Sequence, residues 1–164
     1  MDRYMVTIGA TSTSSTVAPI STSTAIKTLI QLQSSSSDKL TICQWWIEFD
    51  GTTAAPPVKV ELLRTTTNAT VTAYTSSDIV KWSDANAAAS SIALSTTASG
   101  YNASAEGTFG TVQTLEVHHV MPSSGILVQY PLGREPTVPA STNLRLRVTT
   151  ATAYNAYAGI VWEE

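Results

Sequence analysis

The chain has 164 residues, of which 43% are hydrophobic and only 13% are charged, and its formal net charge is −3. Its nine Lys and Arg residues are too sparse to form a basic stripe along a phosphate backbone, so nucleic acid is excluded as an expected partner. The single cysteine, Cys43, excludes an intramolecular disulfide framework and a cysteine-based zinc site.

Composition favours strands over helices. The chain contains 26 Thr and 20 Ser, and Thr, like the Val and Ile that are also frequent here, suits the pleated surface of a sheet. The first residues lack the apolar core of a signal peptide, and no stretch approaches the roughly 18 apolar residues of a membrane span. We therefore expect a folded, β-rich protein that is not secreted and does not contact a membrane.

The N-terminal part is predicted to be a strand followed by an extended arm. Tyr4 to Ile8 is the strand, and residues 9–24 are mostly Ser, Thr and Ala. Within this run Val17, Pro19 and Ile20 are the predicted anchoring points. Two interpretations stay open, an arm that docks on a neighbouring subunit and an unattached tail.

Residues 25–164 are predicted to form a single domain of short strands, because period-two alternation recurs between turn signals such as Asp50-Gly51. We expect a hairpin between residues 58–64 and residues 69–74. The least regular region is 75–110, where Ala85 to Ala89 favours at most one short helical turn. The predicted strands are residues 25–33, 39–49, 58–64, 69–74, 111–121, 126–130, 143–149 and 155–162.

These strands predict an all-β fold. No amphipathic helices separate them, so the strands cannot be joined by parallel crossovers, and an antiparallel two-sheet β-sandwich of the jelly-roll type follows. The alternation also predicts which side chains line its core: Ile42 or Trp46, then Val58, Val60, Leu62, Leu144, Leu146, Val148 and Ile160.

No pattern of catalytic or metal-binding residues stands out. His118 and His119 are neighbours on a predicted strand, so their side chains point to opposite faces and cannot chelate one ion. Carboxylates are scattered, and no Gly-x-Ser-x-Gly sequence occurs. We expect neither an enzyme, nor a metal site, nor a cofactor.

Several residues are instead candidates for a contact surface. Trp45 and Trp46 point to opposite faces of their strand, so one is expected in the core and the other, assigned as Trp45, at a subunit interface. Arg145 and Arg147 share the non-core face of another strand, where they form either a solvated face or, together with Arg134 and Glu135, an interface.

Five stretches carry a resemblance to a known group of proteins: Ile47–Gly51, Val58–Arg64, Gly100–Thr108, Tyr130–Pro136 and Asn155–Glu164. They resemble small structural proteins of tailed bacteriophages, among them capsid decoration, or cement, proteins, and the resemblance spans roughly residues 25–164. It implies a β-sandwich homotrimer on the outer surface of the virion, assembled in the host cytoplasm. Its implied partner is the major capsid protein, whose subunits it would bridge to stabilise the shell.

An alternative function uses the exposed aromatic residues. A carbohydrate- or receptor-binding β-sandwich module of a phage tail or head fibre would place Tyr154, Tyr157, Tyr101 or Trp82 against its ligand. A hydrolase on the same scaffold would need converging carboxylates or a triad, and no local spacing supports either.

Overall fold

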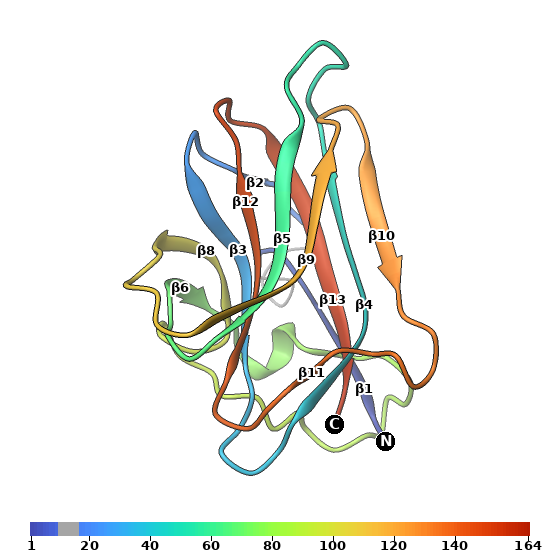
Figure 1. The fold of residues 1–164 in the computed structure, drawn as a ribbon. Helices are drawn as coiled ribbons and strands as arrows, with labels where there is room; N and C mark the ends of the chain where they lie inside the picture. The colour runs from blue at the N-terminus through green and yellow to red at the C-terminus, as the bar shows by residue number, and fades with distance from the viewer. Residues whose placement is uncertain (10–16) are drawn as a thin grey trace.

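The computed structural model describes residues 1–9 and 17–164, which form two antiparallel sheets packed face to face (Figure 1). The seven-stranded sheet has the order β10 (Gly125–Gln129), β4 (Leu40–Phe49), β13 (Asn155–Glu163), β1 (Arg3–Thr7) and β7 (Val80–Lys81), with β11 (Thr137–Val138) beside β4 and β2 (Ile20–Ser21) beside β13. The six-stranded sheet has the order β6 (Thr70–Ala73), β8 (Gly100–Ala105), β3 (Ile26–Gln33), β12 (Asn143–Thr149), β5 (Val58–Thr65) and β9 (Val112–Val120).

The described residues thus confirm an all-β sandwich. Their only helical element is a short 3₁₀ helix, Ser76–Asp78. Within the same residues, no helix is long and apolar enough to cross a membrane.

The core lies between the two sheets and is built by the predicted alternation. In β5 the side chains of Val58, Val60 and Leu62 are fully buried, and so are Leu144, Leu146 and Val148 of the neighbouring β12. Of the two alternatives in β4, Ile42 is buried, whereas Trp46 is only half-buried on the outer face. Ile160 of β13 is also buried, so the predicted core is confirmed with Ile42 as its member.

One local prediction is wrong, and one strand was not predicted. Strands β5 and β6 do not form a hairpin, because β5 pairs with β12 and β9 while β6 pairs with β8. The region 75–110 contains a strand, β8, that its sequence did not indicate. Residues 84–87, where at most one short helical turn was predicted, form a single turn closed by the Ala87 N–H donating to the Asp84 carbonyl (3.0 Å).

The N-terminal strand and part of the predicted arm belong to the sandwich. Both β1 and β2 pair with β13, so the boundary predicted at residue 24 does not separate two structural units in the described residues. After β2, the Thr22 N–H donates to the Tyr154 carbonyl (2.8 Å), and the Tyr154 N–H donates to Thr22 Oγ1 (3.0 Å). Residues 10–16 of the predicted arm lie outside the described residues.

Candidate contact surfaces

The outer face of the seven-stranded sheet carries a row of apolar residues. Leu127 of β10 pairs with Trp46 of β4, which pairs in turn with Gly159 of β13. A Cβ atom on Gly159 would overlap the indole of Trp46, so the ring lies directly against the bare backbone of β13. Leu127 is 62% exposed, and Tyr157, two residues before Gly159 on the same face, is 39% exposed. This face therefore exposes apolar side chains to solvent.

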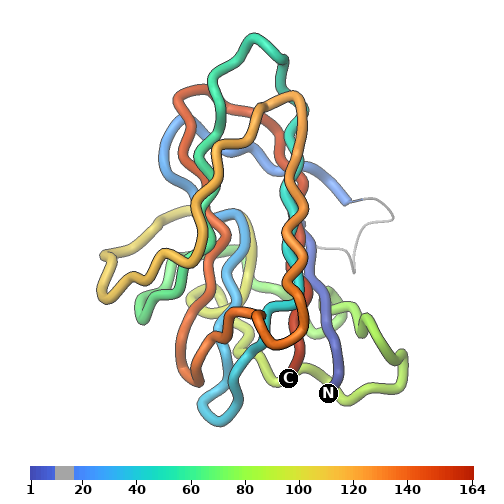
Figure 2. Tube along the Cα trace, turned by 45° about the vertical axis from the view of Figure 1, so that its right-hand side comes forward, coloured from blue at the N-terminus to red at the C-terminus, as the bar shows by residue number. Residues whose placement is uncertain are grey.

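A second group of exposed apolar residues lies at the end of the sandwich that holds the chain termini. Leu132 is 86% exposed at the tip of the β10–β11 connection, in a turn closed by the Arg134 N–H donating to the Pro131 carbonyl (3.0 Å). Trp82 is 51% exposed, and its backbone N–H donates to the carbonyl of Arg3 (2.7 Å). Figure 2 shows the segment after β7, in light green, close to the N-terminus.

The predicted contact residues Arg134 and Glu135 belong to the same connection as Leu132. Arg134 is exposed and Glu135 is half-buried. Gly133, between Leu132 and Arg134, has φ +81°, a backbone conformation that glycine adopts without strain and that lets the turn project Leu132 into solvent. Arg134 and Glu135 thus lie beside an apolar side chain that is almost fully exposed.

The three predicted anchors of the arm have different environments. Val17 is 42% exposed and Pro19 is also exposed, whereas Ile20 is buried. Ile20 pairs with Ala156 of β13 and packs in the core. Ile20 therefore anchors the chain to its own sandwich, which corrects its assignment to a contact with a neighbouring subunit.

Trp45 lies in the core and not on a contact surface. Its side chain is fully buried, and its indole N–H donates to the hydroxyl of Tyr130 (3.1 Å). The Tyr130 hydroxyl donates to Glu116 Oε1 (2.6 Å), and Glu116 Oε2 lies 3.0 Å from His118 Nε2. The prediction that Trp45 lies at an interface and Trp46 in the core is thus wrong, because β4 turns Trp45 inward and Trp46 outward.

This network joins the two sheets at one edge of the sandwich. Glu116 and His118 come from β9, the last strand of the six-stranded sheet, whereas Tyr130 follows β10, the last strand of the other sheet. Burial, followed by the hydrogen bond to Glu116, raises the pKa of Tyr130 well above its ordinary value. The phenol therefore stays protonated and donates to the carboxylate.

Arg145 and Arg147 share the outer face of the six-stranded sheet, as predicted, but this face is covered by the chain itself. The guanidinium of Arg145 donates to the carbonyls of Thr67 (2.5 Å) and Glu106 (3.1 Å). Arg147 forms an ion pair with Glu61 (3.1 Å). The ring of Phe109 lies over both arginines, 5.1 Å and 4.8 Å from their guanidinium carbons.

Arg145 is consequently fully buried, which corrects its assignment to an interface. Burial also lowers the pKa of its guanidinium. The cover consists of two connections, residues 66–69 and 106–111, which lie side by side across the sheet (Figure 2). Arg145 therefore binds both connections to the six-stranded sheet through its hydrogen bonds to Thr67 and Glu106.

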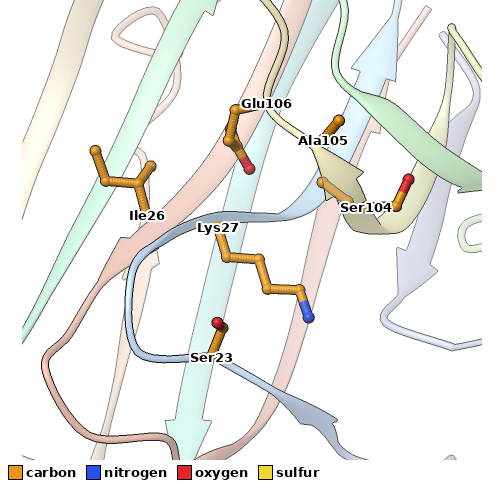
Figure 3. A pocket seen from close by; sticks show the side chains of 7 residues that line it. Ser23, Ile26, Lys27, Ser104, Ala105 and Glu106 are labelled. Carbon is orange, nitrogen blue, oxygen red and sulfur yellow. The ribbon is translucent and has the colours of Figure 1, made fainter.

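A pocket of about 240 Å³ lies between the start of β3 and the end of β8 (Figure 3). The ammonium of Lys27 donates to the Ser21 carbonyl (2.9 Å), and burial lowers its pKa. Glu106 accepts hydrogen bonds from the backbone N–H (2.5 Å) and the hydroxyl (2.7 Å) of Thr28. Because the charged groups are already bound within the chain, this pocket gives no catalytic arrangement.

The two histidines lie as their strand position predicts. His118 is half-buried beside Trp45, whereas His119 is exposed. Among the described residues, no three His, Cys, Asp or Glu side chains are grouped so that they could hold a metal ion.

Comparisons with protein-family models, with curated proteins and with solved structures find no match to this chain. The features that bear on its function are therefore the exposed apolar residues and the pockets of its own surface.

Two features of that surface were missed by sequence reasoning. Leu127 occupies an outward position of the predicted strand 126–130, so alternation alone could have found it. Leu132 lies between Pro131 and Gly133, a combination typical of a projecting turn. By contrast, the bond between Glu116 and Tyr130 joins strands of different sheets and leaves no local signal.

Proposed function

We propose that this chain is a structural protein of a phage particle that binds the outside of the capsid and stabilises the shell by bridging capsid subunits. The observation that carries the proposal is the gathering of exposed apolar side chains on one face and one end of a sandwich with few charges. Its principal members, Leu132, Leu127 and Trp82, are each more than half exposed. Apolar groups of this kind, rimmed by polar residues, are typical of protein-binding surfaces.

We infer that the contact with the capsid is centred on Leu132 and Trp82. A protruding leucine and a tryptophan are suitable anchors, because a few large side chains that enter pockets of the partner carry most of the binding energy. Arg134 beside Leu132 adds a charged group at the rim, where it would affect the rate of association more than the affinity.

We also propose that the sandwich is a jelly roll. Support comes from the chain order: β1, β3, β4 and β5 alternate between the two sheets, β5 and β9 pair within the six-stranded sheet, and β9, β10, β12 and β13 alternate again. The last two of these strands, β12 and β13, lie inside the sheets between strands from the first half of the chain. This arrangement fits two Greek keys, a form found in viral capsid proteins and lectins.

A homotrimer is the proposed assembly. The low charge density of the chain suits extensive contacts between copies, and the open face around Leu127 and Tyr157 supplies apolar surface for them. Light scattering of the purified chain should give three times the monomer mass. A monomer both in solution and on isolated particles would contradict this proposal.

The capsid proposal is tested with particles of the phage that encodes the chain. Quantitative mass spectrometry of purified virions should find it at a copy number comparable to that of the major capsid protein. For the contact itself, the double variant Leu132→Ser/Trp82→Ser is mixed with particles that lack the chain, and the bound fraction is measured after sedimentation. We expect a loss of affinity of about tenfold or more.

The matched control is Val117→Ser, which removes an exposed valine from β9, at the edge of the other sheet. It should bind like the unchanged chain. Absence of the chain from virions would overturn the capsid proposal, whereas equal binding of the double variant and the control would overturn the assignment of the contact.

A further inference from the structure

A second pocket, of about 370 Å³, lies at the end of the sandwich opposite the chain termini. Figure 1 shows that the β4–β5 and β12–β13 connections meet at this end. Their side chains, with Ser21 of β2, line the pocket with hydroxyl groups, small apolar groups and one carboxylate. The lining includes Asp50, Thr52, Ala55, Thr152, Tyr154 and Asn155.

The carboxylate of Asp50 is held in place by Asn155. Asp50 Oδ1 accepts the backbone N–H of Asn155 (3.0 Å), and Oδ2 accepts its side-chain amide (2.7 Å). The backbone N–H of Asp50 also donates to the Asn155 carbonyl (3.2 Å). Because an ionised carboxylate can accept about four hydrogen bonds, both oxygens keep capacity for a ligand, and both residues are exposed. The carboxylate is thus fixed before any ligand binds.

The pocket also has an apolar side. The ring of Tyr154 lies so close to Gly51 that a Cβ atom there would come within 2.8 Å of ring atom Cδ1. Ala55 and Tyr154 add small and aromatic carbon surface, while Thr52 and Thr152 contribute hydroxyls. A ligand that fits must therefore combine hydroxyl donors with a C–H surface.

The charges narrow the ligand class. Asp50 disfavours an anion, and no Lys or Arg lines the described pocket to compensate. One carboxylate is also too few for a calcium site, which needs six to eight oxygen ligands. A neutral polyol meets both requirements, since its hydroxyls can donate to the carboxylate in charge-assisted hydrogen bonds and its C–H face can pack on carbon.

We propose that this pocket binds a neutral saccharide. Asp50 accepts hydrogen bonds from two adjacent sugar hydroxyls, and the amide of Asn155 binds a neighbouring one. Preorganisation of the carboxylate by Asn155 lowers the ordering cost of binding. The pocket lies away from the end that holds Leu132 and Trp82, so this activity is separate from the proposed contact with the capsid.

The test uses the full chain and saturation-transfer NMR with D-glucose, D-galactose, D-mannose and N-acetyl-D-glucosamine, followed by an array of neutral oligosaccharides. We expect binding of at least one of these probes. Asp50→Asn should weaken it about tenfold or more, because a charged acceptor becomes neutral. Thr52→Trp should abolish it by filling the pocket.

Glu48→Gln is the matched control, because Glu48 is an exposed carboxylate of β4, two residues before Asp50. It should bind like the unchanged chain, and thermal unfolding establishes that each variant is folded. Three results would overturn the proposal: no binding of any probe, equal binding by Asp50→Asn, or binding that disappears when calcium is chelated. None of these results depends on whether the chain attaches to a capsid.

Discussion

The two outer faces of the sandwich differ in what covers them. On the six-stranded sheet, residues 66–69 and 106–111 cross over the strands, and the arginines of β12 are enclosed beneath them. On the seven-stranded sheet, Trp46 packs on its own neighbour Gly159, and Leu127 beside it is exposed. Both faces carry the outward residues of regular strands, so alternation alone does not decide whether a side chain meets solvent.

The difference also separates stability from binding. The covered face is held by charge-assisted hydrogen bonds to backbone carbonyls, which stabilise the fold but leave few groups for a partner. On the open face, Leu127 and Tyr157 keep apolar surface exposed to solvent. Substitutions on the two faces should therefore have unequal effects on the free energy of unfolding.

The largest effect is expected from Arg145→Ala. This change removes the buried guanidinium that holds both connections, and it leaves the half-buried carbonyls of Thr67 and Glu106 without this donor. Loss of one partner from a buried charged network costs about 3–5 kcal/mol. Urea unfolding followed by tryptophan fluorescence measures it.

Arg134→Ala is the control, because Arg134 is exposed and should change stability by no more than about 0.5 kcal/mol. If the two substitutions lower the free energy of unfolding equally, the covered face stabilises the fold no more than an exposed turn does.

A smaller loss is expected from Gly159→Ala on the open face. The added Cβ would overlap the indole of Trp46, so the ring must move, and overpacking of this kind costs about 1–3 kcal/mol. The double variant Trp46→Ala/Gly159→Ala should recover part of this loss relative to Trp46→Ala alone. A double-mutant cycle without coupling would show that the ring does not rest on Gly159.

The edge where the two sheets meet should make stability depend on alkaline pH. Because the pKa of Tyr130 is raised in the folded chain, the unfolded chain loses its phenolic proton first. The contribution of Tyr130 to the free energy of unfolding is thus fully present below about pH 10, and it is lost as the pH rises above that value. Burial also raises the pKa of Tyr4 and of Tyr74, so these two groups add to the same alkaline loss of stability.

Tyr130→Phe should lower the free energy of unfolding by about 1 kcal/mol at neutral pH, because its hydrogen bonds are lost, and should make the alkaline decline less steep. Unfolding in urea at several pH values measures both effects. Tyr157→Phe, at an exposed tyrosine, provides the comparison. An unchanged alkaline slope in Tyr130→Phe would contradict the role of the buried phenol.

The smallest effect on stability is expected from Leu127→Ser. The leucine is largely exposed, so its loss should change the free energy of unfolding by about 0.5 kcal/mol or less. If the open face joins copies of the chain, the same variant should reduce the mass measured by light scattering. A strong loss of stability in a monomer would instead place Leu127 in the packing of the chain itself.

By itself, the sequence determined most strands and the inward side chains. Residues 143–149 were predicted with the boundaries of β12, and the alternation in β5 and β12 identified six fully buried residues. These predictions succeed because the direction of a side chain on a strand is a local property with a period of two. The same regularity placed Arg145 and Arg147 on one face.

Only the tertiary structure decided which strands pair and what covers each face. β5 and β6 are neighbours in sequence, yet β8, β3 and β12 lie between them in the sheet. The burial of Arg145 depends on Thr67 and Glu106, which come from distant segments of the chain. The burial of Trp45 depends on how β4 pairs with β13, because this pairing turns the side chain of Trp45 toward the core. Pairing and cover are set by long-range packing, which the period of a single strand does not encode.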